Sequence, residues 1–289
     1  MISKVSPVFY KTLILLFFIK LLLISTVSAQ SRLYHAVVDD NYRKARRFLA
    51  RGDNPNGGGN AQYIPLIATA EHNRYKIAVL LINKGANINI QNHIGFTPLM
   101  ECAIQRNNRI LRFLIKNDAN LELKANNGAT ALMIAVTAGN TSTARVLLDA
   151  GAKVNIKDND GITPLMSAVE NGKNIEMVRM LVEYNADLEM KDNEGNTALM
   201  AFPYRNRIPT HDELIDLGAN VNTTNKKGTT PLIKAVVEGN MDMVKILVSN
   251  GANIDTRDND GLSAMDYSYT QMEIRDYLLQ VIEENESNN

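Results

Sequence analysis

A pattern of turn, short helix, break and second helix recurs along most of this chain, and the usual step between copies is 33 residues. In the copy from Asn155 to Asp187, the stretch 158–161 (DNDG) predicts a turn, because Asp and Asn bond their own backbone and Gly adopts positive φ. Thr163-Pro164 then predicts a helix start, since Thr caps an unpaired backbone N–H and Pro has none to lose there. Gly172 ends this helix, and Val and Leu at i, i+3, i+4 mark a second one.

Copies of this unit must stack, because neither two-turn helix can bury its apolar stripe alone. The copies are found in register, and only the step from Pro164 to the next copy is 34 residues. The first helical position is occupied in turn by Pro65, Pro98, Ala131, Pro164, Ala198, Pro231 and Ala264. The preceding cap is Thr97, Thr130, Thr163, Thr197, Thr230 or Ser263. Gly85, Gly151, Gly218 and Gly251 end the second helices, and Asp118 and Asn185 take that place in two copies.

This period, with D-x-x-G-x-T-P-L at the hairpin and G-A-x-x-N at the close, resembles the ankyrin repeat over nearly all of residues 31–280. The resemblance implies an all-α fold, an α-solenoid of stacked ankyrin repeats, with about six full repeats between divergent N- and C-terminal caps. The family has His where this chain has Met100, Met133, Met166, Met200 and Ile233. More apolar packing is therefore expected at these helix starts.

Residues 1–29 differ from the rest and predict a secretory signal peptide. Lys4 and Lys11 precede an apolar run from Leu13 to Ile24, and Val27-Ser28-Ala29 offers small residues before a cleavage site at Gln30. Lys20 inside the run disfavours a permanent membrane span. Export to a periplasm is the simplest expectation. The alternatives are secretion and an uncleaved N-terminal anchor. Contact with a membrane is expected only if the segment stays uncleaved.

Within the predicted array of residues 30–280, two copies depart from the pattern. Pro203 falls inside a first helix, so Phe202 to His211 is predicted to be a distorted helix and loop, either a tolerated lesion or a specific binding feature. The first copy has a basic outer face, which is interpreted as a polar cap or as a surface for an acidic partner; it comprises Arg43, Lys44, Arg46, Arg47 and Arg51. Residues 281–289 are predicted to be a disordered polar tail.

Composition excludes several classes of function. Lys plus Arg and Asp plus Glu both number 31, so the net charge of zero argues against a nucleic-acid binder. The single cysteine, Cys102, excludes an internal disulfide framework and occupies the small-residue position of its helix. The four histidines lack ligand spacing, and no catalytic motif is found. We therefore expect no enzyme activity, no cofactor and no metal site.

The ankyrin resemblance implies that a partner binds in a groove formed by hairpin tips and by the exposed sides of the first helices. The matching tip residues are His93, Ile94, Phe96, Asn126, Asn127, Asn159, Asp160, Ile162, Asn193, Glu194, Lys226 and Lys227. The matching helix residues are Ile104, Gln105, Thr137, Glu170, Asn171, Val237 and Glu238. Apolar tip side chains with a polar rim are typical of a protein interface, although Ile94 and Phe96 could instead cover neighbouring hairpins.

The sequence thus predicts a monomeric, non-catalytic protein-protein interaction scaffold outside the cytoplasm, with a protein partner of unknown identity. A secreted effector or toxin-immunity component is the alternative, and a cryptic hydrolase is a third hypothesis.

Overall fold

The computed structural model describes residues 32–58, 63–172, 174–201 and 209–287, and these residues form helices, turns and loops without a strand. The chain divides into two compact units, residues 1–126 and 127–289. Within the described ranges, no helix is both long and apolar enough to span a bilayer.

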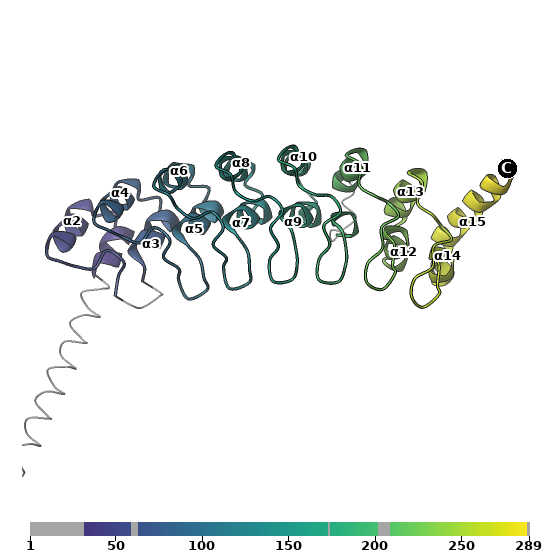
Figure 1. Ribbon diagram of the computed structural model, residues 1–289, viewed down its shortest axis with the longest axis horizontal. Coiled ribbons are helices and arrows are strands. Elements are labelled where there is room, and N and C mark those ends of the chain that lie inside the picture. Colours follow the sequence, from purple (N-terminus) through teal and green to yellow (C-terminus); the bar gives the residue numbers. More distant parts are fainter. Residues whose placement is uncertain (1–31, 59–62, 173, 202–208, 288–289) are drawn as a thin grey trace, which may run out of the picture. The chain divides into compact units, whose positions relative to one another are not determined.

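In the first unit, helices pair along the chain and the pairs stack side by side (Figure 1). After a helical stretch at 32–38 come α2 (Tyr42–Ala50), α3 (Pro65–Glu71), α4 (Tyr75–Asn83), α5 (Pro98–Gln105) and α6 (Asn108–Lys116). The second helices α2, α4 and α6 form one row, and the first helices α3 and α5 form another, with the hairpins projecting beyond the first-helix row. This is the arrangement that the ankyrin resemblance predicted.

The second unit repeats the same two rows. Its first helices are α7 (Ala131–Thr137), α9 (Pro164–Asn171), the 3₁₀ turn η1 (Ala198–Met200), α12 (Pro231–Val237) and α14 (Ala264–Tyr267) with η2 (Ser268–Thr270). Its second helices are α8 (Thr141–Asp149), α10 (Ile175–Glu183), α11 (Pro209–Asp216), α13 (Met241–Ser249) and α15 (Met272–Ser287). Six repeats lie between two divergent terminal copies, as predicted, but the described first helix of the fifth repeat is only the short turn η1.

The predicted cap residues start the first helices. The Thr97 hydroxyl accepts the Met100 N–H at 3.2 Å, and the Met100 sulfur accepts the Thr97 N–H at 3.4 Å. Met100 is 1% exposed, so the position that holds His in the family is apolar here and keeps only a weak sulfur acceptor. The predicted helix stops are also confirmed, since Asp118 and Asn185 adopt φ of 62° and 64°.

Adjacent hairpins are joined by hydrogen bonds from one tip to the next. The backbone N–H of Asn193 donates to the Asp160 carbonyl at 3.0 Å, and its side-chain amide donates to the Asn159 carbonyl at 2.8 Å. A Cβ on Gly161, where φ is +81°, would lie 2.6 Å from the Asn193 nitrogen. Both the conformation and the close approach of the next hairpin therefore require glycine at this position.

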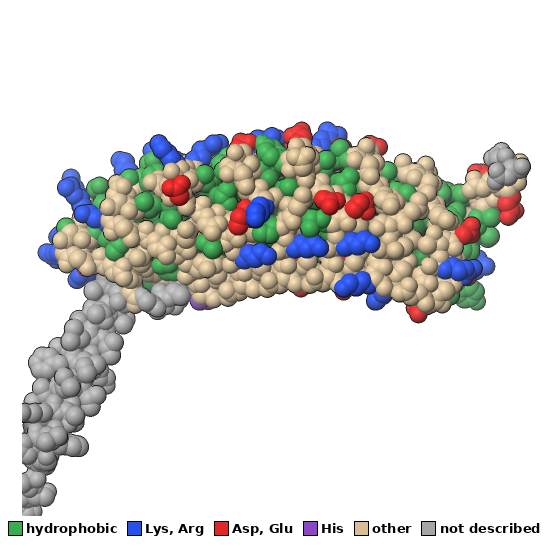
Figure 2. Space-filling view, viewed as in Figure 1, with side chains coloured by type: hydrophobic (Ala, Val, Ile, Leu, Met, Phe, Trp, Pro, Cys, Tyr) green, Lys and Arg blue, Asp and Glu red, His purple; other side chains and the backbone are tan. Residues whose placement is uncertain are grey.

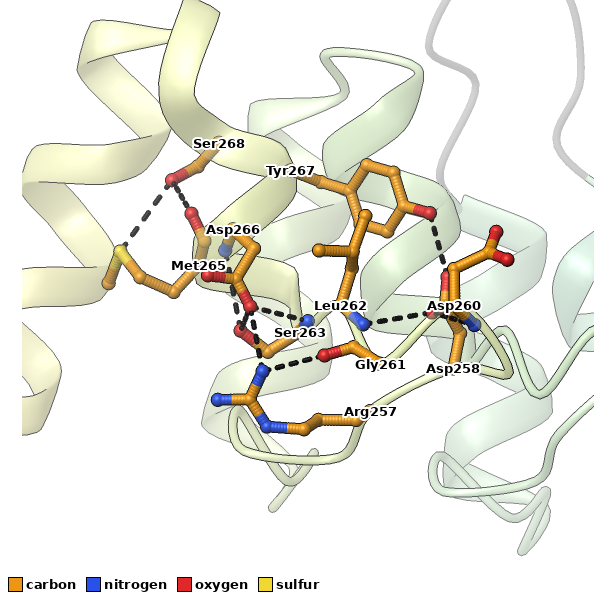
Figure 3. A network of polar contacts seen from close by, with 10 residues as sticks. All are labelled: Arg257, Asp258, Asp260, Gly261, Leu262, Ser263, Met265, Asp266, Tyr267 and Ser268. Atoms are coloured by element: carbon orange, nitrogen blue, oxygen red, sulfur yellow. Dashed lines mark hydrogen bonds and ion pairs between the residues drawn. The ribbon is translucent and has the colours of Figure 1, made fainter.

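In the last repeat, a carboxylate replaces the buried methionine sulfur at the helix start (Figure 3). Asp266 Oδ2 accepts the Ser263 N–H and hydroxyl, each at 2.8 Å, and an Arg257 guanidinium N–H at 3.1 Å. These hydrogen bonds, first of all the one from the Ser263 backbone, hold the pKa of Asp266 below its usual value.

The C-terminal end differs from the expectation of a disordered tail over residues 281–289. Helix α15 continues to Ser287, and Gln280 donates to Glu284 at 2.9 Å within this last part of the helix. The polar composition of this segment reflects a solvent-facing helix, because only Ile274 and Leu278 of α15 are buried.

Candidate functional site

The repeat that contains Pro203 has a shortened first helix in the part that the structure describes. Helix η1 has only three residues and ends at Met200, whereas α9 before it and α12 after it have 8 and 7 residues. Of the predicted distortion over Phe202 to His211, residues 202–208 lie outside the described part of the chain, whereas 209–211 form the regular first turn of α11, so the prediction is wrong for these three residues. The Thr197 hydroxyl, unlike its counterparts in other repeats, caps no backbone N–H and is buried without a partner among the described residues.

A pocket of about 170 Å³ lies where η1 stops, between α9 and α12. Its apolar side chains are Ile162, Met166 and Met200, and its charged ones are Glu170, Asp192 and Lys234. Among the described residues, Asn196, Thr197 and Ala201 also line it. These residues come from α9 and from η1, each with the hairpin before it, from the C-cap residue of η1, and from α12.

Lys234 compensates for the interruption. Its ammonium donates to the Met200 carbonyl at 2.6 Å, and a carboxylate oxygen of Glu238 lies 3.9 Å from it. Met200 is the last residue of η1, so this turn itself supplies no amide to the Met200 carbonyl. Cations stabilise helix C-termini for the same reason. Lys234 therefore both caps the broken helix and supplies the positive charge of the pocket wall.

The interrupted repeat also contains a buried histidine. His211 on α11 is 1% exposed, and burial lowers its pKa to about 4, although the backbone of Ala201 acts in the opposite direction. His211 is therefore neutral at pH 7, which suits a core position better than acid–base chemistry at neutral pH.

In the first unit, the predicted partner-binding residues show mixed exposure. Ile94 at the hairpin tip is 44% exposed and Ile104 on α5 is 40% exposed, so both are available for contact. Phe96 is only half-buried, whereas His93 and Gln105 are exposed, and Gln105 donates to Glu101 at 3.0 Å. The structure therefore leaves two isoleucines of one repeat open to a partner.

In the second unit, the pocket brings together Ile162 and Glu170 from the predicted set, and Val237 on α12 is 54% exposed. The sequence analysis did not select Met166, Asp192, Met200 or Lys234. Asn127, Thr137, Asn159, Asp160, Asn193, Glu194, Lys226, Lys227 and Glu238 are exposed, and Asn171 is half-buried.

Several predicted tip residues have a structural role that the sequence did not suggest. The Asn126 amide donates to the His93 carbonyl at 3.0 Å in the first unit. In the second unit, the Lys226 ammonium donates to the Asn193 carbonyl at 2.8 Å. These side chains join one hairpin to the next, so their main role is to hold adjacent hairpins together, and any contact with a partner is secondary. Asn stands two residues before four of the hairpin glycines, at Asn126, Asn159, Asn193 and Asn259, and this recurrence is the sequence signal that could have shown the role of the asparagines.

No group of three or more His, Cys, Asp or Glu in the described ranges could hold a metal ion. Cys102 is buried in α5, and burial raises the pKa of its thiol, so it behaves as a small core residue. The sequence-based interpretation of Cys102 is confirmed.

Comparison with known proteins agrees with this geometry. A family model of ankyrin repeats in three copies matches residues 66–158 and 150–225, and a second model of ankyrin repeats matches residues 214–268. The crystal structure of the human ASB11 ankyrin repeat domain is similar, with a TM-score of 0.65 and 26% sequence identity. The match covers 75% of this chain and 97% of that domain. No curated protein matches the chain.

Proposed function

Because this chain belongs to the ankyrin-repeat family, we propose that it binds one protein partner through its hairpin tips and first helices. The ankyrin fold serves as a non-catalytic interaction scaffold. We propose further that this binding takes place outside the cytoplasm. The pocket at the interrupted repeat is the observation that carries the proposal. It lies among the first helices of the second unit, and its lining combines methionine and isoleucine side chains with charged groups. An apolar centre with a polar rim is the usual anatomy of a binding hot spot.

The size of the pocket favours a side chain over a cofactor. Ligand pockets for drug-sized molecules have volumes of roughly 300–1,000 Å³, whereas this one measures about 170 Å³. Met166 and Met200 offer flexible, polarisable surfaces that adapt to an inserted group. We propose that a large apolar side chain of the partner fills this pocket and that Glu170 and Val237 contact the surrounding backbone.

Export is a separate part of the proposal and rests on residues 1–29 alone. Lys4 and Lys11, the apolar run from Leu13 to Ile24 and the small residues before Gln30 support it. Cell fractionation with N-terminal sequencing tests this part. A mature chain beginning at Gln30 in the periplasmic fraction supports export, whereas an uncut chain in the cytoplasm contradicts it.

The binding proposal is tested by affinity capture with a test variant and a control variant, each carrying two substitutions. Glu170→Lys with Val237→Asp changes an exposed residue that lines the pocket and an exposed residue of α12, and Arg145→Glu with Lys245→Glu changes two exposed positions on second helices. We expect the first variant to lose its dominant partner while its circular dichroism and melting are unchanged, and the second to retain it. Equal loss in both variants would contradict the proposed surface.

A further inference from the structure

The net charge of zero conceals a separation of charge between the two units. Residues 32–126 contain 14 Lys and Arg against 7 Asp and Glu, a net charge of +7. Residues 127–289 contain 14 Lys and Arg against 24 Asp and Glu, a net charge of −10. Such a distribution produces local fields that the total charge does not show.

The positive charge of the first unit gathers on its second helices. The sequences of α2, α4 and α6 together hold eight Lys and Arg and no Asp or Glu. Every second helix of the other unit, from α8 to α15, includes at least one acid. The basic helices are neighbours, and Figure 2 shows their Lys and Arg side chains gathered over this row. We call this surface the basic face; its charged residues are Arg43, Lys44, Arg46, Arg47, Lys76, Arg109, Arg112 and Lys116.

Aromatic side chains lie between these cations. Tyr42 is 40% exposed beside Arg43 on α2. On α6, the Arg109 guanidinium lies 3.9 Å from the centroid of the Tyr75 ring, which itself packs edge-on against Phe113. Tyrosine beside Lys and Arg is typical of the membrane–water interface, because the ring is partly apolar and its hydroxyl stays hydrated.

We propose that the basic face binds the surface of a bilayer that contains anionic phospholipid. Its cations are spread over three adjacent helices rather than gathered round one pocket, which suits a layer of headgroups. Under the proposed export, the N-terminal apolar run enters a membrane before it is cleaved, which brings this unit close to a bilayer; this one argument rests on the proposed function. That run ends at Ile24, and the eight residues to Arg32 span at most about 29 Å. This surface is separate from the proposed partner-binding surface.

Vesicle flotation of the full chain tests the proposal. The test variant is Arg43→Gln, Arg46→Gln, Arg112→Gln, and the control variant with the same change in charge is Arg145→Gln, Lys227→Gln, Lys245→Gln. All six side chains are exposed. Both variants keep residues 1–31, so the contribution of the apolar run is the same in each. Melting curves confirm that both are folded.

The wild-type chain should bind vesicles of 30% phosphatidylglycerol in phosphatidylcholine at least a hundredfold more tightly than pure phosphatidylcholine vesicles. Each cation near an anionic bilayer contributes roughly fivefold, so the test variant should lose about a hundredfold in partitioning. The control variant should stay within about twofold of wild type, and raising the salt concentration should weaken binding of the wild type.

Several results would overturn the proposal. Equal losses in the two variants would mean that only the net charge matters. Equal binding of the wild type to both kinds of vesicle would remove the role of anionic headgroups. Tighter binding to duplex DNA or RNA than to the anionic vesicles, lost in the test variant, would instead assign the basic face to nucleic acid.

Discussion

The Lys234 cap on the interrupted helix makes a quantitative prediction about stability. Lys234→Met keeps most of the aliphatic stem and removes the ammonium that donates to the Met200 carbonyl at 2.6 Å. Hydrogen bonds from charged groups contribute about 1.5–3 kcal/mol. The Lys234 side chain is 28% exposed, so solvent screens part of this interaction. We therefore expect the free energy of unfolding of this region to fall by about 1.5 kcal/mol.

Hydrogen–deuterium exchange measured by peptide is the suitable assay, because repeat arrays open locally rather than as one unit. Exchange should accelerate about tenfold in peptides that cover 190–201 and remain unchanged in peptides from α5. The control is Lys245→Met on α13, which lies on the exposed side of a second helix. Unchanged exchange over 190–201 in the Lys234 variant, or equal acceleration in the control, would refute the capping role.

Three further predictions concern the hairpins, the core and the last repeat. Gly161→Ala should destabilise by at least 2 kcal/mol, since its Cβ would meet the Asn193 nitrogen, whereas Gly151→Ala, with φ of +89° and open space, should cost only about 1 kcal/mol in urea unfolding. A pKa of about 4 for His211 in the fold, against 6.5 unfolded, adds stability above pH 6.5 that is lost between pH 6.5 and 4, about 3 kcal/mol in all. When the pH is lowered from 7 to 4.5, the His211→Leu variant should therefore lose less stability than the wild type. An equal loss would show that the titration of His211 does not contribute to the pH dependence of stability. The pKa of Asp266 in the fold lies below its unfolded value of 3.8, so the carboxylate stabilises the fold above that value, and this stabilisation is lost as the pH falls through the folded pKa. Asp266→Asn should therefore make the melting temperature depend less on pH between pH 5 and 2.5.

The regular part of the fold was predictable from the sequence because its signals are local. A threonine before a proline fixes a helix start, and Gly172 fixes its end, without reference to any distant residue. The position of Pro203 predicted an interrupted helix for the same reason.

The details of the site were less predictable, because they depend on contacts between repeats. Lys234 reaches a carbonyl 34 residues earlier in the chain, a pairing that only the stacked helices create. The Asn126 amide was assigned to a partner, whereas it bonds the preceding hairpin. The charge separation could have been read from the sequence. It is not visible in the total charge, because the opposite charges of the two units nearly cancel.

Site-specific photo-crosslinking in cells tests the central claim most directly. A photoreactive residue at Glu170 lies beside the pocket, and one at Lys245 on α13 serves as the control. One dominant protein linked through Glu170 and absent from Lys245 is the predicted result. A partner linked equally through both positions, or through Lys245 alone, would contradict binding at the first helices.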